Sequence, residues 1–265
     1  YPVYKLMADT KEPFDPKAYL ASVTGYYTDT DGNMLSMPFN SSTPVLYYNK
    51  DLFKKAGLDP EKAPKTWQEV EAAAKAVQAA GATCGFTTGW QSWVQIENFS
   101  AWHNIPIGTK SNGFAGTDTE FTFNSPAHVK HISTLAEWQQ SKIFDYGGRR
   151  SDSAPKFYNQ ECAMYMNSSA GYAGVKANVK FDFGVSRLPY WPDVASEPQK
   201  KRAKGAYLKC LDYSVKYQYF DEDSRSCEEW LSKNYPSEFH LIDDDQTVNA
   251  FAAPGGFVYI YTGLI

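Results

Sequence analysis

Signals for helices and strands alternate along the first two thirds of the chain, and this alternation limits the fold more than any other feature. Residues 66–80 form the clearest helix, because Thr66 and Glu69 make a capping box at its start. Ser125 and Pro126 begin another helix that runs to residue 142. Helices that alternate with strands favour an α/β fold, with the helices packed on a largely parallel sheet. The other expected elements are a helix at 50–56, a helix after residue 169, and strands at 35–48, 84–88, 162–166 and 183–188.

The pattern changes after residue 192. The basic run at 200–204 is expected to form a solvated helix face rather than a partner patch, and helical spacing continues through 208–219 and 221–231. Strand signals return at 239–242 and 257–262. The sequence therefore predicts three parts, which are residues 1–192, a helical segment at 193–238 and a β-rich fragment at 239–265.

Charge and hydropathy exclude several classes of protein. The formal net charge of −4 over 265 residues argues against nucleic-acid binding, which requires a basic surface. No apolar run reaches the roughly 18–20 residues of a membrane span. The chain opens at Tyr1 without the charged and apolar regions of a signal peptide, so we expect a mature or truncated chain.

Motifs of catalysis and cofactor binding are missing from the sequence. It contains no G-x-S-x-G elbow, no P-loop and no G-x-G-x-x-G motif, and its acidic clusters are contiguous rather than spaced as an acid–base pair. His128 and His131 lie on one expected helix and could bind zinc with a third ligand, but we expect both to face solvent. The sequence thus predicts no enzyme, no catalytic residue, no metal and no cofactor.

The cysteines leave two readings open. Four of them, Cys84, Cys162, Cys210 and Cys227, allow three pairings if all are oxidised, and none forms a C-x-x-C pair. Cys84 and Cys162 each begin an expected strand. If the two strands are neighbours, the pair is either a disulfide or two buried thiols.

Two clusters of aromatic and hydroxyl side chains each follow an expected strand. Residues 89–93 (GWQSW) contain Trp90 and Trp93, whose flat faces suit the C–H groups of a sugar or polyol, although tryptophan pairs are more common in cores. In residues 167–171 (NSSAG), Ser168 and Ser169 are either an anion cradle or an ordinary helix cap. Ligands of open α/β sheets bind beyond the carboxyl ends of strands, so both clusters are candidate binding residues.

Several segments carry a resemblance to one family. They are residues 38–43 (PFNSST), 46–53 (LYYNKDLF), 65–67 (KTW), 157–159 (FYN) and 162–164 (CAM). These segments resemble the extracellular solute-binding proteins of ABC importers. Residues 40–50, 89–93 and 97–102 are most similar to the members that bind sn-glycerol-3-phosphate, and the likeness runs from residue 1 to about 192.

The resemblance implies two α/β lobes that close on a ligand and deliver it without chemistry. The ligand would be glycerol-3-phosphate or a related polyol phosphate or sugar, the partners would be the membrane permease subunits of an importer, and the location would be periplasmic or extracellular. Ser42 would hydrogen-bond the ligand and Trp90 would pack on its glycerol moiety. Trp93, Ser168 and Ser169 would add further contacts.

The resemblance is incomplete at both ends. The βαβ units with which the family begins are absent, and so are the segments beyond residue 194 that supply a serine, a glycine, a tyrosine and an arginine to the family's site. An arginine fork is a strong part of phosphate recognition. We therefore expect such a fragment to bind its ligand weakly or not at all.

The tail is similar to a second family. Residues 239–243 and 248–264 resemble the strands that precede the active-site helix of M48-type zinc metallopeptidases. That family depends on an H-E-x-x-H motif, which this sequence does not contain. Two alternatives therefore stand beside solute binding, namely a truncated metallopeptidase fragment and a chimeric product with no complete site.

Overall fold

The computed structural model describes residues 1–19, 25–29, 31–38, 42–195, 239–242, 250–253 and 257–261. The chain divides into two compact units. One is Pro44–Gln199, called here the sheet unit, and the other combines Tyr1–Thr43 with Lys200–Ile265. The basic run at 200–204 and the helices expected at 208–219 and 221–231 lie outside the described residues. The three-part division expected from sequence stays a prediction.

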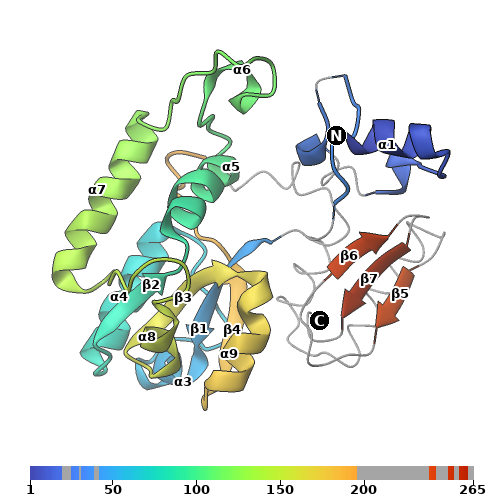
Figure 1. Cartoon of the computed structure of the whole chain (residues 1–265). Coiled ribbons are helices and arrows are strands. Elements are labelled where there is room, and N and C mark those ends of the chain that lie inside the picture. Colours follow the sequence, from blue (N-terminus) through green and yellow to red (C-terminus); the bar gives the residue numbers. More distant parts are fainter. Residues whose placement is uncertain are drawn as a thin grey trace. The chain divides into compact units, whose positions relative to one another are not determined.

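The sheet unit is built on four strands in the order β2-β3-β1-β4 (Figure 1). They are β1 (Pro44–Asn49), β2 (Cys84–Thr88), β3 (Cys162–Ser168) and β4 (Phe183–Arg187). β2 and β3 pair in parallel, whereas β1 is antiparallel to both β3 and β4. The expected α/β class is thus present, but the sheet is mixed and not largely parallel. Periodicity fixes which residues form a strand, and it carries no information about the strand's direction.

Side chains of each strand alternate between two covered faces, as the pleat requires. On one face, Leu46 and Tyr48 of β1 and Phe86 of β2 belong to the main hydrophobic core, together with side chains of α4 (Trp67–Ala79) and α7 (Pro126–Ser141). On the other, Tyr47 packs near Tyr165 and Phe183, and α8 (Ala154–Tyr158) adds Phe157. Burial on both faces explains why β1 and β3 are almost continuously apolar.

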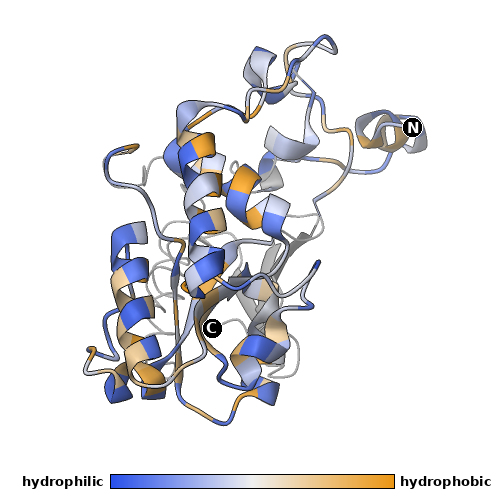
Figure 2. Ribbon diagram, turned by 90° about the vertical axis from the view of Figure 1, so that its left-hand side faces the viewer, coloured by the Kyte–Doolittle hydropathy of each residue, from blue (hydrophilic) through white to orange (hydrophobic). Residues whose placement is uncertain are grey.

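α4 and α7 begin at the expected residues, but the Ser125 side chain does not cap α7 and lies 2.7 Å from His128 Nδ1 instead. Thr66 Oγ1 accepts a hydrogen bond from the Glu69 backbone N–H at 3.2 Å, and the Glu69 carboxylate accepts one from the Thr66 backbone N–H at 3.2 Å, so the capping box of α4 is confirmed. Apolar and polar residues share each helix, as expected for helices covering a sheet (Figure 2).

The shorter segments of the sheet unit are α3 (Lys50–Lys55), a π-helical stretch (Trp93–Asn98), α5 (Phe99–His103), α6 (Thr109–Asn112), a 3-10 turn (Ser169–Gly171) and α9 (Tyr172–Asn178).

His128 and His131 are buried, and the expectation that both face solvent is wrong. His131 is 1% exposed; its Nδ1 accepts from the Trp191 indole N–H at 3.2 Å, and its Nε2 lies 3.0 Å from Gln95 Oε1. His128 lies between the hydroxyls of Ser100 and Ser125, each 2.7 Å from a ring nitrogen. Their i, i+3 spacing placed both rings on the core-facing side of α7, because that side is where the buried residues of α7 lie.

The second unit contains α1 (Val3–Thr10), a 3-10 turn (Pro16–Ala18) and three short strands. The strands are β5 (Phe239–Ile242), β6 (Ala250–Ala253) and β7 (Phe257–Tyr261), in the order β5-β7-β6. β5 is parallel to β7, and β6 is antiparallel to it. The strands expected at 239–242 and 257–262 are confirmed to within a residue, whereas β6 was not predicted.

Candidate functional site

One edge of the four-stranded sheet gathers the ends of several strands. β2, β3 and β4 all run against β1, so their carboxyl ends meet at the edge where β1 begins. The segment that leads into residue 147 joins this set, because Phe144 forms a parallel bridge with Phe86 of β2. We call this the carboxyl edge. Loops that follow parallel strands bind ligands in α/β proteins, so this edge is the candidate site.

Trp90 stands at the carboxyl edge directly after β2. The Gly89 N–H donates to the Met166 carbonyl of β3 at 2.8 Å, and the Trp90 N–H donates to the Arg150 carbonyl at 2.7 Å. A Cβ atom at Gly89 would lie 2.8 Å from that same Arg150 carbonyl oxygen, so the tight approach requires glycine. Trp90 has a left-handed backbone (φ 45°) and a side chain that is 44% exposed. Its backbone is therefore held in place while part of the residue is open to solvent.

Trp93 is placed differently from Trp90. It begins the π-helical stretch, its carbonyl accepts from Asn98 Nδ2 at 2.8 Å, and its half-buried ring packs against the main hydrophobic core. The two tryptophans of the GWQSW cluster thus differ, one fitting the interpretation as core and the other the interpretation as a ligand contact. Trp93 mainly serves the core, and Trp90 is the one with an open face.

The serines after β3 have local roles. Ser168 Oγ accepts from the Ala170 N–H at 3.1 Å, which caps the short 3-10 turn, and the Ser168 carbonyl accepts from the Tyr47 hydroxyl at 2.8 Å. Ser169 is buried. The arrangement matches the ordinary capping role that the sequence also allowed. Ser168 remains half-exposed at the carboxyl edge, within reach of solvent on one side.

Asn167 links the loops of the carboxyl edge. It is buried, its Nδ2 donates to Ser151 Oγ at 3.2 Å and to the Tyr165 hydroxyl, and its Oδ1 accepts from the Ser168 N–H at 2.7 Å. The backbone of Gly89 lies against the same amide. Asn167 therefore joins the loops after β2 and β3 to residues 147–153. Sequence reasoning missed this role and missed Arg150, although the Gly147-Gly148 pair before Arg149 and Arg150 marks an unusual loop.

Ser42 belongs to the other compact unit. It precedes β1 by two residues in the chain and is exposed. The neighbouring Asn40 and Ser41 lie outside the described residues.

Cys84 and Cys162 are joined in a disulfide, with their Cα atoms 4.5 Å apart. The two residues face each other in the parallel β2–β3 register, at the opposite end of both strands from the carboxyl edge. This settles their two open readings in favour of the bridge. Cys210 and Cys227 lie outside the described residues.

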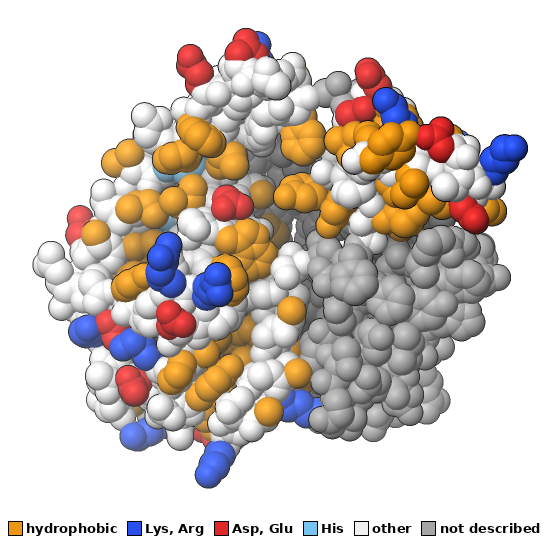
Figure 3. Space-filling model, in the orientation of Figure 1, with side chains coloured by type: hydrophobic (Ala, Val, Ile, Leu, Met, Phe, Trp, Pro, Cys, Tyr) orange, Lys and Arg blue, Asp and Glu red, His pale blue; other side chains and the backbone are white. Residues whose placement is uncertain are grey.

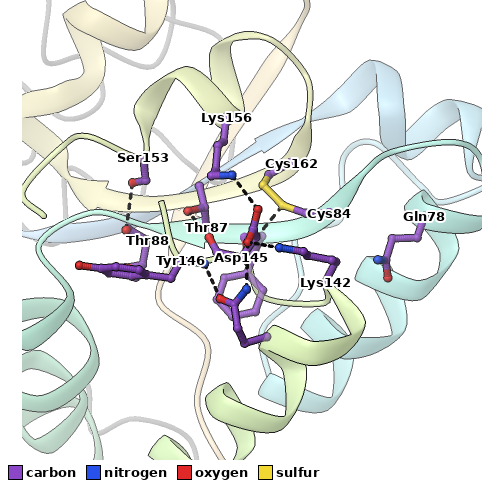
Figure 4. The surroundings of a disulfide bond; sticks show 12 residues. Gln78, Cys84, Thr87, Thr88, Lys142, Asp145, Tyr146, Ser153, Lys156 and Cys162 are labelled. Carbon is purple, nitrogen blue, oxygen red and sulfur yellow. Dashed lines mark hydrogen bonds and ion pairs between the residues drawn. A yellow bond between two sulfur atoms is a disulfide. The ribbon is translucent and has the colours of Figure 1, made fainter. Parts of the chain in front are cut away.

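Asp145 carries the strongest local charge arrangement near the disulfide (Figure 4). Burial alone would raise the pKa of this carboxyl group, but hydrogen bonds from Lys142, Lys156 and Gln139 outweigh it and lower the pKa to about 2. Both lysine Nζ atoms lie 2.7 Å from the carboxylate. The carboxylate is thus fully paired, and these contacts fix the segment around Asp145 that leads into residue 147.

Clusters of metal-binding side chains and membrane-spanning helices are both absent from the described residues. No group of three or more His, Cys, Asp or Glu side chains among them is arranged to hold a metal ion. Within the same ranges, no helix is long and apolar enough to cross a membrane.

The sequence matches known proteins over most of its length. The family described as "Bacterial extracellular solute-binding protein" matches residues 2–208, which extends past the boundary expected at 192. The chain is 49% identical over 219 residues to the sn-glycerol-3-phosphate-binding periplasmic protein UgpB of Yersinia pestis, covering 82% of this chain and 50% of that protein. It is 50% identical over 208 residues to the protein of the same name in Pectobacterium atrosepticum, covering 78% and 47%. The chain thus spans about half the length of these relatives.

Solved structures share the fold. UgpB from Mycobacterium tuberculosis, in complex with glycerophosphocholine, matches with a TM-score of 0.60 and 20% identity over 96% of this chain and 62% of that one. Maltose-bound MalE3 of T. maritima matches with a TM-score of 0.57 and 18% identity over 88% and 67%. These likenesses confirm the α/β fold of periplasmic-binding-protein lobes.

Proposed function

The chain belongs to the family of bacterial extracellular solute-binding proteins, and on that premise we propose that it binds glycerol-3-phosphate or a related polyol phosphate or sugar outside the cytoplasm. In this proposal it passes the ligand to the membrane permease subunits of an ABC importer and catalyses no reaction. The relatives at about half identity are named for sn-glycerol-3-phosphate, which supports the first of these ligands.

The exposed face of Trp90 at the carboxyl edge is the observation that carries the proposal. A rigid indole offers an apolar surface to the C–H groups of a polyol at low entropic cost. Its backbone is fixed from two sides, by β3 through Gly89 and by Arg150. Ser42, Ser168, Ser169 and Trp93 are the further residues proposed to contact the ligand; of these, Ser168 lies at the same edge.

Isothermal titration with glycerol-3-phosphate tests the proposal. Trp90→Ala should weaken the affinity by at least ~1 kcal/mol, or about fivefold, the scale of a buried aromatic contact. Phe121→Ala is the matched control, because Phe121 is another exposed aromatic residue that lies away from β2, in the chain between α6 and α7. Equal affinity of wild type and Trp90→Ala would remove Trp90 from the site. No binding by wild type would favour the alternative of a chain without a complete site.

For the tail we keep the likeness to M48-type metallopeptidases as a separate proposal about origin. The strands β5, β6 and β7 support a β-rich segment at these positions. Because the sequence contains no H-E-x-x-H motif, we expect no proteolysis. A casein assay with and without added zinc checks this expectation, and zinc-dependent cleavage would contradict it.

A further inference from the structure

Arg150 lies beside Trp90, although the two are 60 positions apart in the chain. The centre of its guanidinium group is 5.9 Å from the centroid of the Trp90 ring, the distance of a cation–π contact. The side chain of Arg150 is exposed, as part of the Trp90 ring is. A flat cation therefore stands over the Trp90 ring at the carboxyl edge.

The loop that carries Arg150, residues 147–153, is tightly fixed. Ser153, which is fully buried, donates to the Thr88 carbonyl at 2.9 Å, and Ser151 accepts from Asn167. Arg150 itself has a left-handed backbone (φ 49°), which is unfavourable for a residue with a side chain and persists only where its surroundings impose it. Because the loop is anchored at both β2 and β3, the position of Arg150 is set by the sheet and does not depend on the ligand.

Apart from its contact with the Trp90 ring, the charge of Arg150 has no partner of opposite charge within the described part of the chain. No carboxylate there lies within 4.0 Å of its guanidinium, whereas the nearby Asp145 is paired with Lys142 and Lys156. On the face seen in Figure 3, several acidic and basic side chains lie close together among apolar ones. A guanidinium presents several N–H donors in a plane, a geometry that matches two oxygens of a phosphate at once.

We propose that Arg150 is a specificity-determining residue, which binds the anionic group of a ligand whose carbon skeleton packs on Trp90. The ligand class is a phosphate ester of a small polyol. This inference rests on the proposed function and adds to it the residue that reads the charge. It also provides a guanidinium within this chain. The sequence resemblance had implied that the family's arginine, which lies beyond the position of residue 194, would be missing.

The test compares Arg150→Gln, Arg150→Lys and the wild-type chain in titrations with glycerol-3-phosphate and with glycerol. Arg149→Gln is the matched control, because Arg149 is the adjacent exposed arginine and its loss changes the net charge equally. Arg150→Gln should lower the affinity for glycerol-3-phosphate at least tenfold and flatten its dependence on salt. The affinity of Arg150→Lys should lie between those of Arg150→Gln and wild type, since lysine keeps the charge and loses the planar set of donors. The affinity of Arg149→Gln should stay within twofold of wild type.

Two results would overturn the inference alone: an Arg150→Gln variant that binds glycerol-3-phosphate as tightly as wild type, and an Arg149→Gln variant that loses as much. An equal loss of affinity for glycerol and glycerol-3-phosphate in Arg150→Gln would also overturn it, because the residue would then not read the phosphate. If the wild-type chain binds neither ligand at millimolar concentration, the proposed function itself fails and the inference fails with it. Thermal melting of each variant checks that the exposed substitutions leave the fold intact.

Discussion

The carboxyl edge and the interior of the sheet unit use similar side chains in opposite ways. At the edge, Trp90 and Arg150 are fixed by their backbones and keep ring surface and donors open to solvent. In the interior, a group that we call the histidine layer (His103, His128, His131, Gln95 and Trp191) satisfies its own polar atoms. Thr88 Oγ1 accepts from Gln95, which contacts His131; Trp191 donates its indole N–H to His131 and its backbone N–H to His103 Nε2 at 2.9 Å.

A candidate site differs from a polar core in whether its polar groups already have partners. Aromatic and titratable residues occur in both regions, so residue type does not distinguish them. The histidine layer has its hydrogen-bonding groups paired and its rings buried, which makes it a structural network. The edge has spare capacity for contacts on a rigid support, which is what a binding site requires.

The largest expected effect comes from a change outside both regions. Reduction of the Cys84–Cys162 disulfide, or the Cys84→Ser/Cys162→Ser pair, should lower the free energy of unfolding by about 4 kcal/mol, because the bridge closes a loop with a sequence separation of 78. Denaturant unfolding with and without a reductant measures the loss. The affinity of the molecules that stay folded should not change, because the bridge lies at the far end of β2 and β3. A parallel loss of affinity would show that the edge depends on the bridge.

Acid should break the histidine layer before it affects the edge. Burial, followed by the charges of His103 and His128, lowers the pKa of His131 from 6.5 to about 3, and burial also lowers the pKa of His103 and of His128. The unfolded chain therefore binds more protons below pH 6.5, and stability falls as the pH drops, by about 1.4 kcal/mol per pH unit for each histidine that stays neutral.

Unfolding free energies measured from pH 7 to pH 5 check this expectation. His131→Leu should reduce the slope of stability against pH by the contribution of one histidine, about 1.4 kcal/mol per pH unit at the acid end of this range. This should hold whatever the effect of the substitution on stability at pH 7. The charged groups near the layer are the half-exposed Lys130, which lies over the Trp191 ring, and the exposed Asp193, which pairs with Lys130. This pairing holds the pKa of Asp193 below its usual value, so the charge of Asp193 does not change in this range. A stability that does not change between pH 7 and pH 5 would contradict the neutral, buried state of the layer.

The smallest of these effects is expected from a substitution where the carboxyl edge meets the interior of the sheet unit. Ser153→Ala removes the hydroxyl that donates to the Thr88 carbonyl, and a buried hydrogen bond of this kind contributes about 1 kcal/mol. We expect that loss in stability together with weaker ligand binding, because the loop of Arg150 loses its anchor on β2. Ser141→Ala is a control, since the Ser141 hydroxyl donates to the Trp138 carbonyl at the end of α7, at 3.3 Å, and the substitution leaves the backbone unchanged. Unchanged binding by Ser153→Ala would show that the other anchors suffice.

Local signals predicted the elements of the sheet unit well. The capping box of Thr66 and Glu69 and the start of α7 at Pro126 fall where expected, because caps are read within a few residues. Among the described residues of the strand expected at 35–48, those from Pro44 onward form a strand, β1 (Pro44–Asn49), since strand formation depends on partners elsewhere in the chain. The same reason explains why the direction of β1 was not predicted.

The candidate site was predictable only in part. Trp90 was found because it follows a strand, a feature of the sequence itself. Arg150 could not be predicted from its own surroundings in the sequence. Its contact with Trp90 depends on tertiary pairing, such as the parallel bridge between Phe86 and Phe144, which no local pattern predicts. The burial of His131 was missed because an i, i+3 pair indicates a shared face and leaves open whether that face meets solvent or core.

The place of β1 in the sheet has a consequence for synthesis of the protein. Its two neighbours follow late in the chain: Tyr47 pairs with Tyr165 and with Val185, which lie 165 − 47 = 118 and 185 − 47 = 138 residues later. At roughly 5–20 residues per second, the ribosome needs about 6–24 s to produce the first of them. During that interval the apolar run VLYY, with unpaired backbone on both sides, is the part of the sheet most exposed to wrong partners. Conditions that delay synthesis or release should therefore lower the yield of folded protein through this strand.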